Sequence, residues 1–203
     1  IFRVVSIART LSRHDALFPL DALHLSNTSR RLIAIVSGSP KFSVERRPGQ
    51  RLTEALQELG PSFIKFGQSL STRADLVGED VAADLAELQD HLPPFSPQQA
   101  REIIESEFEL PVEEIYSEFD KEAVAAASIA QVHYAVTTGG LQVAVKILRP
   151  NVEEAFQRDL ELFYWLAEII EQLQPAFRRL RPVDIVRTFH ETVNLEMDLR
   201  LEA

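Results

Sequence analysis

The sequence predicts an α+β protein: a mostly helical N-terminal part, then a small antiparallel sheet, then two further helices. Apolar residues recur at spacings of three and four over residues 50–108 and again after residue 151, which is the period of amphipathic helices. Between residues 119 and 148 the pattern changes to alternating β-branched and aromatic residues, interrupted by Gly139-Gly140. This second pattern is typical of strands joined by a hairpin.

Proline and glycine divide the first helical part into segments. Gly60-Pro61 ends one predicted helix and opens the next, because proline is tolerated in the first helical turn. Ser96 is the expected N-cap of a later helix. The predicted helices are residues 50–59, 62–73, 79–89 and 97–108, with a short turn or helix opened by Pro111.

Three strands are predicted after these helices, and the last two form the hairpin. They are residues 119–127, 129–137 and 141–148. Pro150 ends the sheet, and Asn151 is the expected cap of a long helix whose apolar residues follow the helical period. A break at Gln174-Pro175 precedes a final helix, which Pro182 opens and which runs to the end of the chain.

The composition narrows the function classes. The chain holds 21 basic and 31 acidic residues, which gives a formal net charge of −10. Non-specific nucleic-acid binding requires clustered lysine and arginine, so we expect no nucleic-acid partner. With no cysteine and five scattered histidines, disulfides and thiolate metal sites are excluded, and we expect no metal ligands from this chain. No run of eighteen apolar residues occurs, so we expect no membrane-spanning helix within it.

Residues 1–47 are basic within this acidic chain, with eight lysine and arginine residues against three acidic ones. Such a segment suits anionic lipid headgroups, although a solvated basic face is the more common meaning. We expect three divisions: a basic helical segment over 1–47, a helical extension over 48–117 and a sheet-containing domain over 118–203. Because the chain begins at Ile1 and ends within a helical pattern, we expect a piece of a longer protein.

The third predicted strand carries the sequence Val143-Ala144-Val145-Lys146. A lysine flanked by buried β-branched residues requires a counter-charge. In kinase-type nucleotide sites, a lysine at this place binds the α- and β-phosphates and pairs with a helix glutamate. The alternative is a lysine that extends into solvent from an edge strand.

A run of small residues precedes this strand, where a kinase would carry a glycine-rich loop. The run reads Ala125-Ala126-Ala127-Ser128. Alanine still lets the backbone approach a phosphate closely, but it resists positive φ, so we expect a stiffer loop of different shape. The alternative is a small-residue patch that packs against a helix.

The predicted helix over residues 62–73 contains Lys65-Phe66-Gly67-Gln68. Its polar residues lie on one face and its aromatic residues on the other. The polar face carries amides and hydroxyls where surface helices usually carry more charge, which suits a face covered by another element. An ordinary surface helix is the alternative.

Three acidic residues, Glu196, Asp198 and Glu202, close the sequence. In a regular helix Asp198 and Glu202 share a face, while Glu196 points nearly opposite to Asp198. The three acids can then enter one site only if the helix is distorted or lies between two basic partners, for which Lys65 and Lys146 are candidates. An ordinary acidic helix is the alternative.

Together these segments resemble the UbiB family of atypical protein-kinase-like proteins, and the bacterial members that support ubiquinone biosynthesis are the most similar kind. They occur in the family's order and span about two thirds of the chain. The segments are residues 65–68, 71–76, 88–90 with Pro93-Pro94, 125–133, 143–146 with Arg149-Pro150, and 196–203. The resemblance implies a helical extension packed on an incomplete kinase-like N-lobe of about three antiparallel strands plus an αC-like helix.

The resemblance also implies roles for individual residues. Lys65 and Gln68 match the family's K-x-G-Q signature, which covers the active-site cleft. The nucleotide loop, rich in alanine and unsuited to ordinary protein phosphorylation, matches Ala125, Ala126, Ala127 and Ser128.

The resemblance implies two sets of contacts between charged residues. Lys146 matches the phosphate-binding lysine, and Glu202 matches the glutamate of the αC-like helix that pairs with it. Glu196 and Asp198 match the E-x-D motif that meets the K-x-G-Q helix. These contacts give the acids lysine partners on different sides.

A kinase-like fold also needs a catalytic loop and a D-F-G motif, and neither occurs within residues 1–203. By resemblance, the full-length protein is expected to be an atypical kinase or ATPase that binds ATP with Mg²⁺. It would support ubiquinone biosynthesis on the cytoplasmic side of the bacterial inner membrane, attached through parts outside this chain, with precursor lipids and biosynthetic proteins as partners. Two alternatives remain: a catalytically silent regulatory module that binds nucleotide or isoprenoid lipid, and a helical scaffold.

Overall fold

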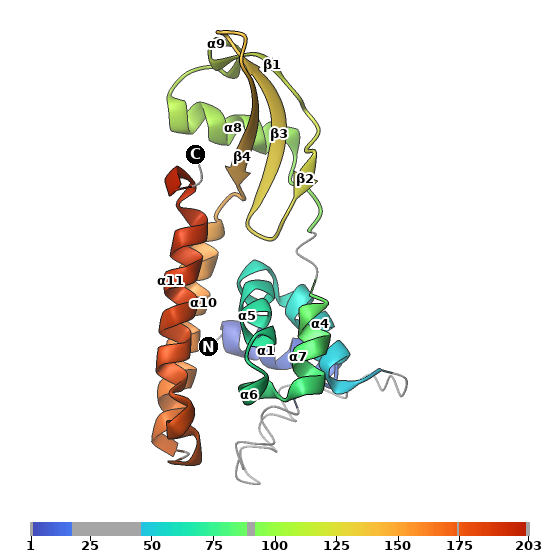
Figure 1. The fold of residues 1–203 in the computed structure, drawn as a ribbon, viewed down its shortest axis with the longest axis vertical. Helices are drawn as coiled ribbons and strands as arrows, with labels where there is room; N and C mark the ends of the chain where they lie inside the picture. Colours follow the sequence, from blue (N-terminus) through green and yellow to red (C-terminus); the bar gives the residue numbers. More distant parts are fainter. Residues whose placement is uncertain (1, 18–45, 89–91, 174, 202–203) are drawn as a thin grey trace. The chain divides into compact units, whose positions relative to one another are not determined.

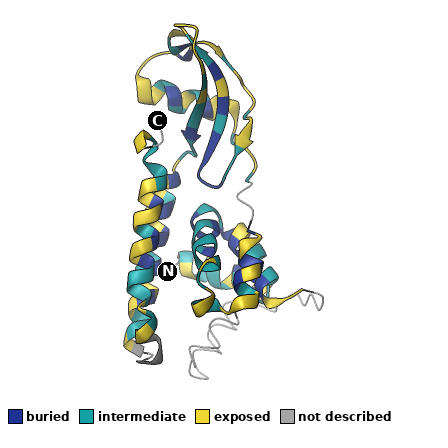
Figure 2. Ribbon diagram, viewed as in Figure 1, coloured by how far each residue is buried: buried dark blue, intermediate teal, exposed yellow. Residues whose placement is uncertain are grey.

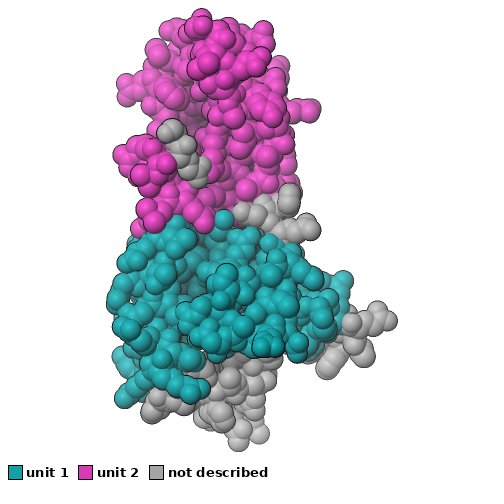
Figure 3. Space-filling view, in the orientation of Figure 1, with its two compact units in different colours: residues 1–88, 156–193 teal, residues 89–155, 194–203 magenta. Residues whose placement is uncertain are grey.

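The structure is a computed structural model that describes residues 2–17, 46–88, 92–173 and 175–201. Most of the predicted basic segment over 1–47 therefore lies outside the described residues. The described chain forms two compact units (Figures 1 and 3). Unit 1 comprises residues 1–88 and 156–193, and unit 2 comprises residues 89–155 and 194–203. The divisions expected from the sequence, after residues 47 and 117, stay predictions.

Unit 1 is helical. Its elements are α1 (Phe2–Arg13), α4 (Pro48–Leu59), α5 (Pro61–Ser71), α6 (Ala74–Val77), α7 (Glu79–Ala86), most of α10 (Val152–Leu173), η1 (Pro175–Leu180) and most of α11 (Pro182–Met197). The predicted break at Gly60-Pro61 is confirmed. Gly60 has φ +106° and donates its N–H to the Leu56 carbonyl, and Pro61 opens α5. A positive φ is readily adopted by glycine, so α4 ends there.

Aromatic side chains fill the core where α5, α10 and α11 meet. The ring centroids of Phe66 and Phe163 lie 4.6 Å apart, and those of Phe63 and Phe163 lie 5.0 Å apart. Phe189 of α11 approaches Phe66 edge-on at 5.2 Å. The predicted aromatic face of the 62–73 helix therefore packs within this unit, with Phe63 buried and Phe66 half-buried, which fixes the orientation of α5.

Unit 2 contains the sheet. Its elements are α8 (Pro97–Phe108), α9 (Val112–Ile115), β1 (Tyr116–Phe119), β2 (Ala125–Ala126), β3 (Ala130–Thr137), β4 (Gln142–Leu148) and η2 (Leu199–Leu201). β3 lies at the centre, with β4 antiparallel on one side and with β1 and β2 antiparallel on the other. Ser96 caps α8 as predicted, because its side chain accepts from the Gln99 N–H. The α+β fold class and the hairpin of β3 and β4 are confirmed.

The first predicted strand, residues 119–127, is wrong in detail, because the chain forms two short strands there, β1 and β2. Both short strands pair with β3, so together they occupy the place of the predicted first strand beside the central strand. The intervening residues include Asp120, Lys121 and Glu122, which have low strand propensity. The N–H groups of Asp120 and Val124 still donate to carbonyls of β3, so the chain leaves the sheet only between them.

The two faces of the sheet differ, and the burial of β3 changes from residue to residue along the strand (Figure 2). One face packs against α8 in a core that includes Ala100, Ile104, Ala135 and Ile147. Because side chains alternate along a strand, Lys146 lies on the other face. The sheet therefore presents its lysine on the side away from α8.

Candidate nucleotide site

The cross-strand register brings predicted site residues into one row. Ala125 of β2 lies opposite Val132 of β3, and Val132 lies opposite Lys146 of β4. Directly opposed residues share a face, with Cβ atoms about 5 Å apart. Ala125 and Lys146, which are separated by twenty residues of sequence, therefore flank Val132 on the face away from α8.

The alanine run makes a tight turn beside this row. Ala127 donates its N–H to the carbonyl of Ala130 at 2.8 Å, which closes β2 onto β3. Among the described residues, none of the turn has a positive φ, so its shape does not require glycine. Ala126 lies opposite Gln131 on the α8 side, and Ser128 is fully buried. Of the four predicted loop residues, Ala125 thus lies on the lysine face and Ala127 in the turn.

A buried polar network lies on the α8 side of β3. Gln131 accepts the N–H of Phe95 at 2.9 Å, and its amide nitrogen lies 2.8 Å from Nε2 of His133. His133 Nδ1 lies 2.7 Å from the carbonyl oxygen of Asp120. A neutral His133 protonated on Nδ1 satisfies every member, because Nδ1–H donates to Asp120 and Nε2 accepts from Gln131. The network ties the segment before α8, and the interruption between β1 and β2, to the central strand.

A shallow hollow of about 460 Å³ lies farther along the sheet. Its lining includes Glu118, Asp120, Tyr134 and Gln142. Two carboxylates make this end unfavourable for an anion, whereas Lys146 favours one at its own end of the strand.

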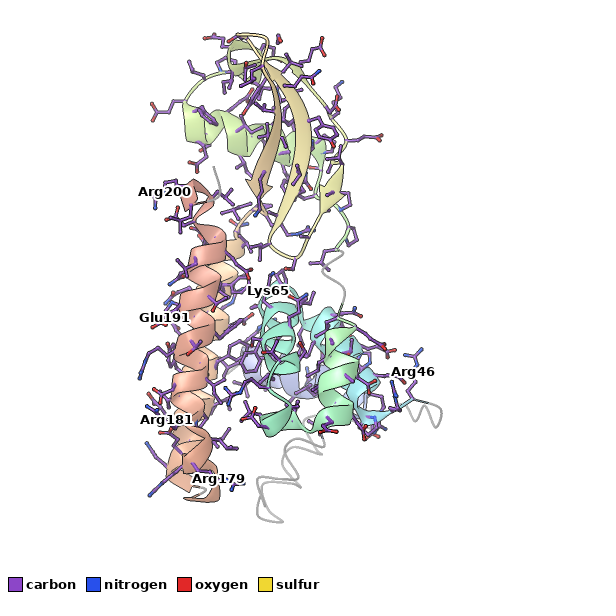
Figure 4. The ribbon with its side chains drawn as sticks, viewed as in Figure 1. Arg46, Lys65, Arg179, Arg181, Glu191 and Arg200 are labelled. Atoms are coloured by element: carbon purple, nitrogen blue, oxygen red, sulfur yellow. The ribbon has the colours of Figure 1, made fainter. Side chains whose placement is uncertain are left out.

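In α5, which carries the K-x-G-Q sequence, Gly67 and Gln68 both make packing contacts within unit 1. A Cβ at Gly67 would lie 2.5 Å from a methyl carbon of Leu88 and 2.7 Å from one of Leu56, so the glycine permits this close approach. Gln68 donates its amide N–H to the Leu88 carbonyl at 3.3 Å. Lys65 is half-buried on the same helix (Figure 4). Gly67 and Gln68 thus both contact Leu88, the second residue after α7.

Three hydroxyl groups at the C-terminal end of this helix bond to its own backbone. Each donates to the carbonyl three residues earlier: Ser69 to Phe66, Ser71 to Gln68 and Thr72 to Ser69. Part of the polar stripe that the sequence presents is therefore satisfied within α5.

The C-terminal acids do not lie on one regular helix. α11 ends at Met197, so the expected angle between Glu196 on the helix and Asp198 beyond it does not apply. Arg200 donates to both carboxylate oxygens of Asp198, at 2.6 and 2.7 Å, and these hydrogen bonds lower the pKa of Asp198 (Figure 4). Glu202 lies outside the described residues, so its pairing with Lys146 stays a prediction.

The sequence did not predict individual roles for two residues of this region, Gln131 and Arg149. The signal for Gln131 was available, because strand alternation places residues 131, 133 and 135 on one face with two polar side chains among them. Arg149 follows the last strand and carried no local signal of its contacts.

The matching family is described as the ABC1 atypical kinase-like domain, and its model covers residues 87–203, more than half of the chain. The chain belongs to this family. The predicted resemblance is confirmed by curated relatives, each named "Probable protein kinase UbiB". The relative from Marinobacter nauticus is 47% identical over 203 residues, which cover 99% of this chain and 37% of the relative. One from Pseudomonas putida is 41% identical, covering 100% of this chain and 38% of the relative.

A further curated relative with the same printed name is also matched over only part of its length. A relative from Pseudomonas aeruginosa is 44% identical over 164 residues, which cover 81% of this chain and 31% of the relative. The matched part of the chain thus spans 31–38% of the length of these curated relatives. A solved structure, the complex of Rv3197 with erythromycin from Mycobacterium tuberculosis, is 30% identical with a TM-score of 0.47, covering 66% of this chain and 34% of that chain.

Proposed function

We propose that this member of the atypical kinase-like family contributes to an Mg-ATP site, and that the full-length protein uses ATP hydrolysis or phosphoryl transfer to support ubiquinone biosynthesis. Family membership and the relatives' printed name, "Probable protein kinase UbiB", support the kinase-like part of the proposal. The proposed place of action is the cytoplasmic side of the bacterial inner membrane. Within the described residues, no helix is both long and apolar enough to cross a membrane.

The observation that carries the nucleotide proposal is the row formed by Ala125, Val132 and Lys146. A nucleotide lying across this row would meet an apolar surface at Val132 and a cation at Lys146. The ammonium group offsets the charge of the α- and β-phosphates, and such charge-assisted hydrogen bonds are among the strong ones. The alanine turn adjoins the same row and offers backbone rather than side-chain contacts.

The remaining predicted site residues complete the proposal. We assign Glu202 as the partner of Lys146, and Lys65 with Gln68 as the cover of the cleft, met by Glu196 and Asp198. Mg²⁺ would arrive with the nucleotide. Among the residues that the structure describes, no group of three histidine or acidic side chains is placed to hold a metal ion.

The test is a titration of the full-length protein with Mg-ADP and Mg-ATP, wild type beside Lys146→Ala. A hydrogen bond to a charged group contributes about 1.5–3 kcal/mol, so the Kd should rise roughly 10- to 100-fold. Lys121→Ala is the matched control, because Lys121 is an exposed lysine of the same unit that lies between β1 and β2. Circular dichroism checks that each variant is folded.

Three outcomes of this titration distinguish a nucleotide site from a scaffold or lipid-binding role. Binding that is lost in folded Lys146→Ala and retained in Lys121→Ala supports the nucleotide site. Equal loss in both variants contradicts the assigned role of Lys146. Absence of binding by folded wild type favours a scaffold or lipid-binding role. ATP turnover by the same full-length protein then separates an enzyme from a silent binding module.

A further inference from the structure

Arg149, the residue after β4, holds the alanine turn from two sides. Its side-chain Nε donates to the carbonyl of Ala127 at 2.9 Å, and its backbone N–H donates to the carbonyl of Ile129 at 2.8 Å. The Ala127 N–H bonds to the Ala130 carbonyl across the same turn. Three carbonyl groups of residues 127–130 therefore have donors, and Arg149 supplies two of these donors.

A second nitrogen of the same guanidinium holds the segment before α8. Its Nη2 donates to the carbonyls of Leu92 and Pro93, at 3.2 and 3.0 Å. The guanidinium carbon lies 5.8 Å from the ring centroid of Phe95, within the range of a cation–π contact. Phe95 is in turn held by Gln131 through its N–H. One arginine thus joins the end of β4, the alanine turn and the segment of residues 92–95, all within unit 2.

These contacts determine the orientation of the turn's peptide groups. In a trans peptide the C=O and the next N–H point in opposite directions. Donors on the carbonyls of Ala127 and Ile129 therefore set two peptide planes, that of the 127–128 peptide and that of the 129–130 peptide. Alanine side chains make no hydrogen bonds, so the turn depends on an outside donor for this orientation.

We propose that Arg149 is a positioning residue, which holds the alanine turn in the shape that accepts the nucleotide phosphates. The inference rests on the proposed nucleotide site and extends it. A binding loop that is already ordered loses less entropy when its ligand binds, so fixing the turn raises nucleotide affinity. Lysine cannot replace Arg149, because its single ammonium lacks the planar fork in which Nε reaches Ala127 while Nη2 reaches residues 92–93.

The experiment compares Arg149→Lys with wild type in the full-length protein, using two measurements. Amide hydrogen exchange of the peptide over 125–130, without nucleotide, reports the order of the turn. Mg-ADP titration reports affinity. Arg101→Lys is the matched control, since Arg101 of α8 belongs to the same unit and bonds Glu105 and Glu113 instead of the turn.

For Arg149→Lys we expect roughly ten-fold faster exchange in the turn and a roughly ten-fold higher Kd for Mg-ADP, with neither change in Arg101→Lys. Faster exchange with unchanged affinity would overturn the positioning role, as would unchanged exchange. Absence of binding by folded wild type overturns the nucleotide proposal and this inference together, whereas wild-type binding that Arg149→Lys retains overturns this inference alone. If Arg149→Lys does not fold, Phe95→Leu is the substitute variant, because it removes only the ring beneath the guanidinium. It should show faster exchange in the turn and a higher Kd for Mg-ADP, both by smaller factors. Absence of these changes in Phe95→Leu also overturns the inference.

Discussion

Asp159 offers a direct test of how unit 1 is held together. This α10 carboxylate has an exposed fraction of 1% and accepts from Nε and Nη2 of Arg3, each at 2.8 Å, and from the hydroxyl of Ser62. The Arg3 guanidinium also lies 5.4 Å from the ring centroid of Phe63 and donates to the Leu59 carbonyl. One buried carboxylate therefore joins α1, α5 and α10.

The perturbation is Arg3→Met, which keeps an apolar stem and removes two of the three donors to Asp159. Breaking a buried ion pair from one side costs about 3–5 kcal/mol. The Arg3 side chain is 33% exposed, so water replaces part of the lost interaction and about 2–3 kcal/mol is expected. At about 1.4 kcal/mol for each factor of ten, amide exchange in α5 and α10 should accelerate roughly 30- to 150-fold.

Hydrogen exchange of the full-length protein, followed by mass spectrometry, measures this effect element by element. Arg13→Met is the matched control on the same helix. Its ion pair with Glu58 is more exposed, with side chains 52% and 40% accessible, so a change below about 1 kcal/mol is expected.

A second variant tests the reasoning from the other side. In Arg3→Met combined with Asp159→Leu, no buried carboxylate is left unpaired, so exchange should be slower than in Arg3→Met alone. The argument is refuted if Arg3→Met behaves like Arg13→Met. It is also refuted if the double variant exchanges faster than Arg3→Met.

Two further predictions concern the turn and the C-terminal acids. Ala127→Gly should keep the backbone hydrogen bonds of the turn but destabilise its conformation by about 0.5–1 kcal/mol. We expect a changed preference between Mg-ADP and Mg-ATP, or autophosphorylation, in the full-length protein. Unchanged nucleotide preference without autophosphorylation would count against the loop assignment. The pKa of Asp198 lies below its ordinary value because of hydrogen bonds from Arg200. This stabilising contribution is therefore present at neutral pH and lost as pH falls through the lowered pKa. In Arg200→Gln, the NMR titration midpoint of Asp198 should rise, and an unmoved midpoint would show that Arg200 is not the cause.

The sequence by itself determined the features that depend on neighbouring residues. Gly60-Pro61 separates α4 from α5, and Ser96 caps α8. The glycine pair after residue 138 lies in the connection between β3 and β4. These signals act through local backbone conformation and local hydrogen bonds, so a short window of sequence contains their whole cause. The joint order of weak motifs was also sufficient to indicate the family.

Only the tertiary structure decided which residues meet across the sheet. The row of Ala125, Val132 and Lys146 depends on register, and a shift of one residue would move Lys146 to the α8 face. The pairing of both short strands, β1 and β2, with the same central strand β3 is likewise a tertiary feature.

The contacts of Arg149 were beyond sequence reasoning for the same physical reason. Its partners in residues 92–93 lie more than fifty positions away in the chain, and a guanidinium can donate to any carbonyl that folding brings within reach. Likewise, nothing adjacent to Gly67 in sequence indicates that Leu56 and Leu88 approach it. Local propensity thus specified the elements, while long-range packing decided which side chains and carbonyls share a site.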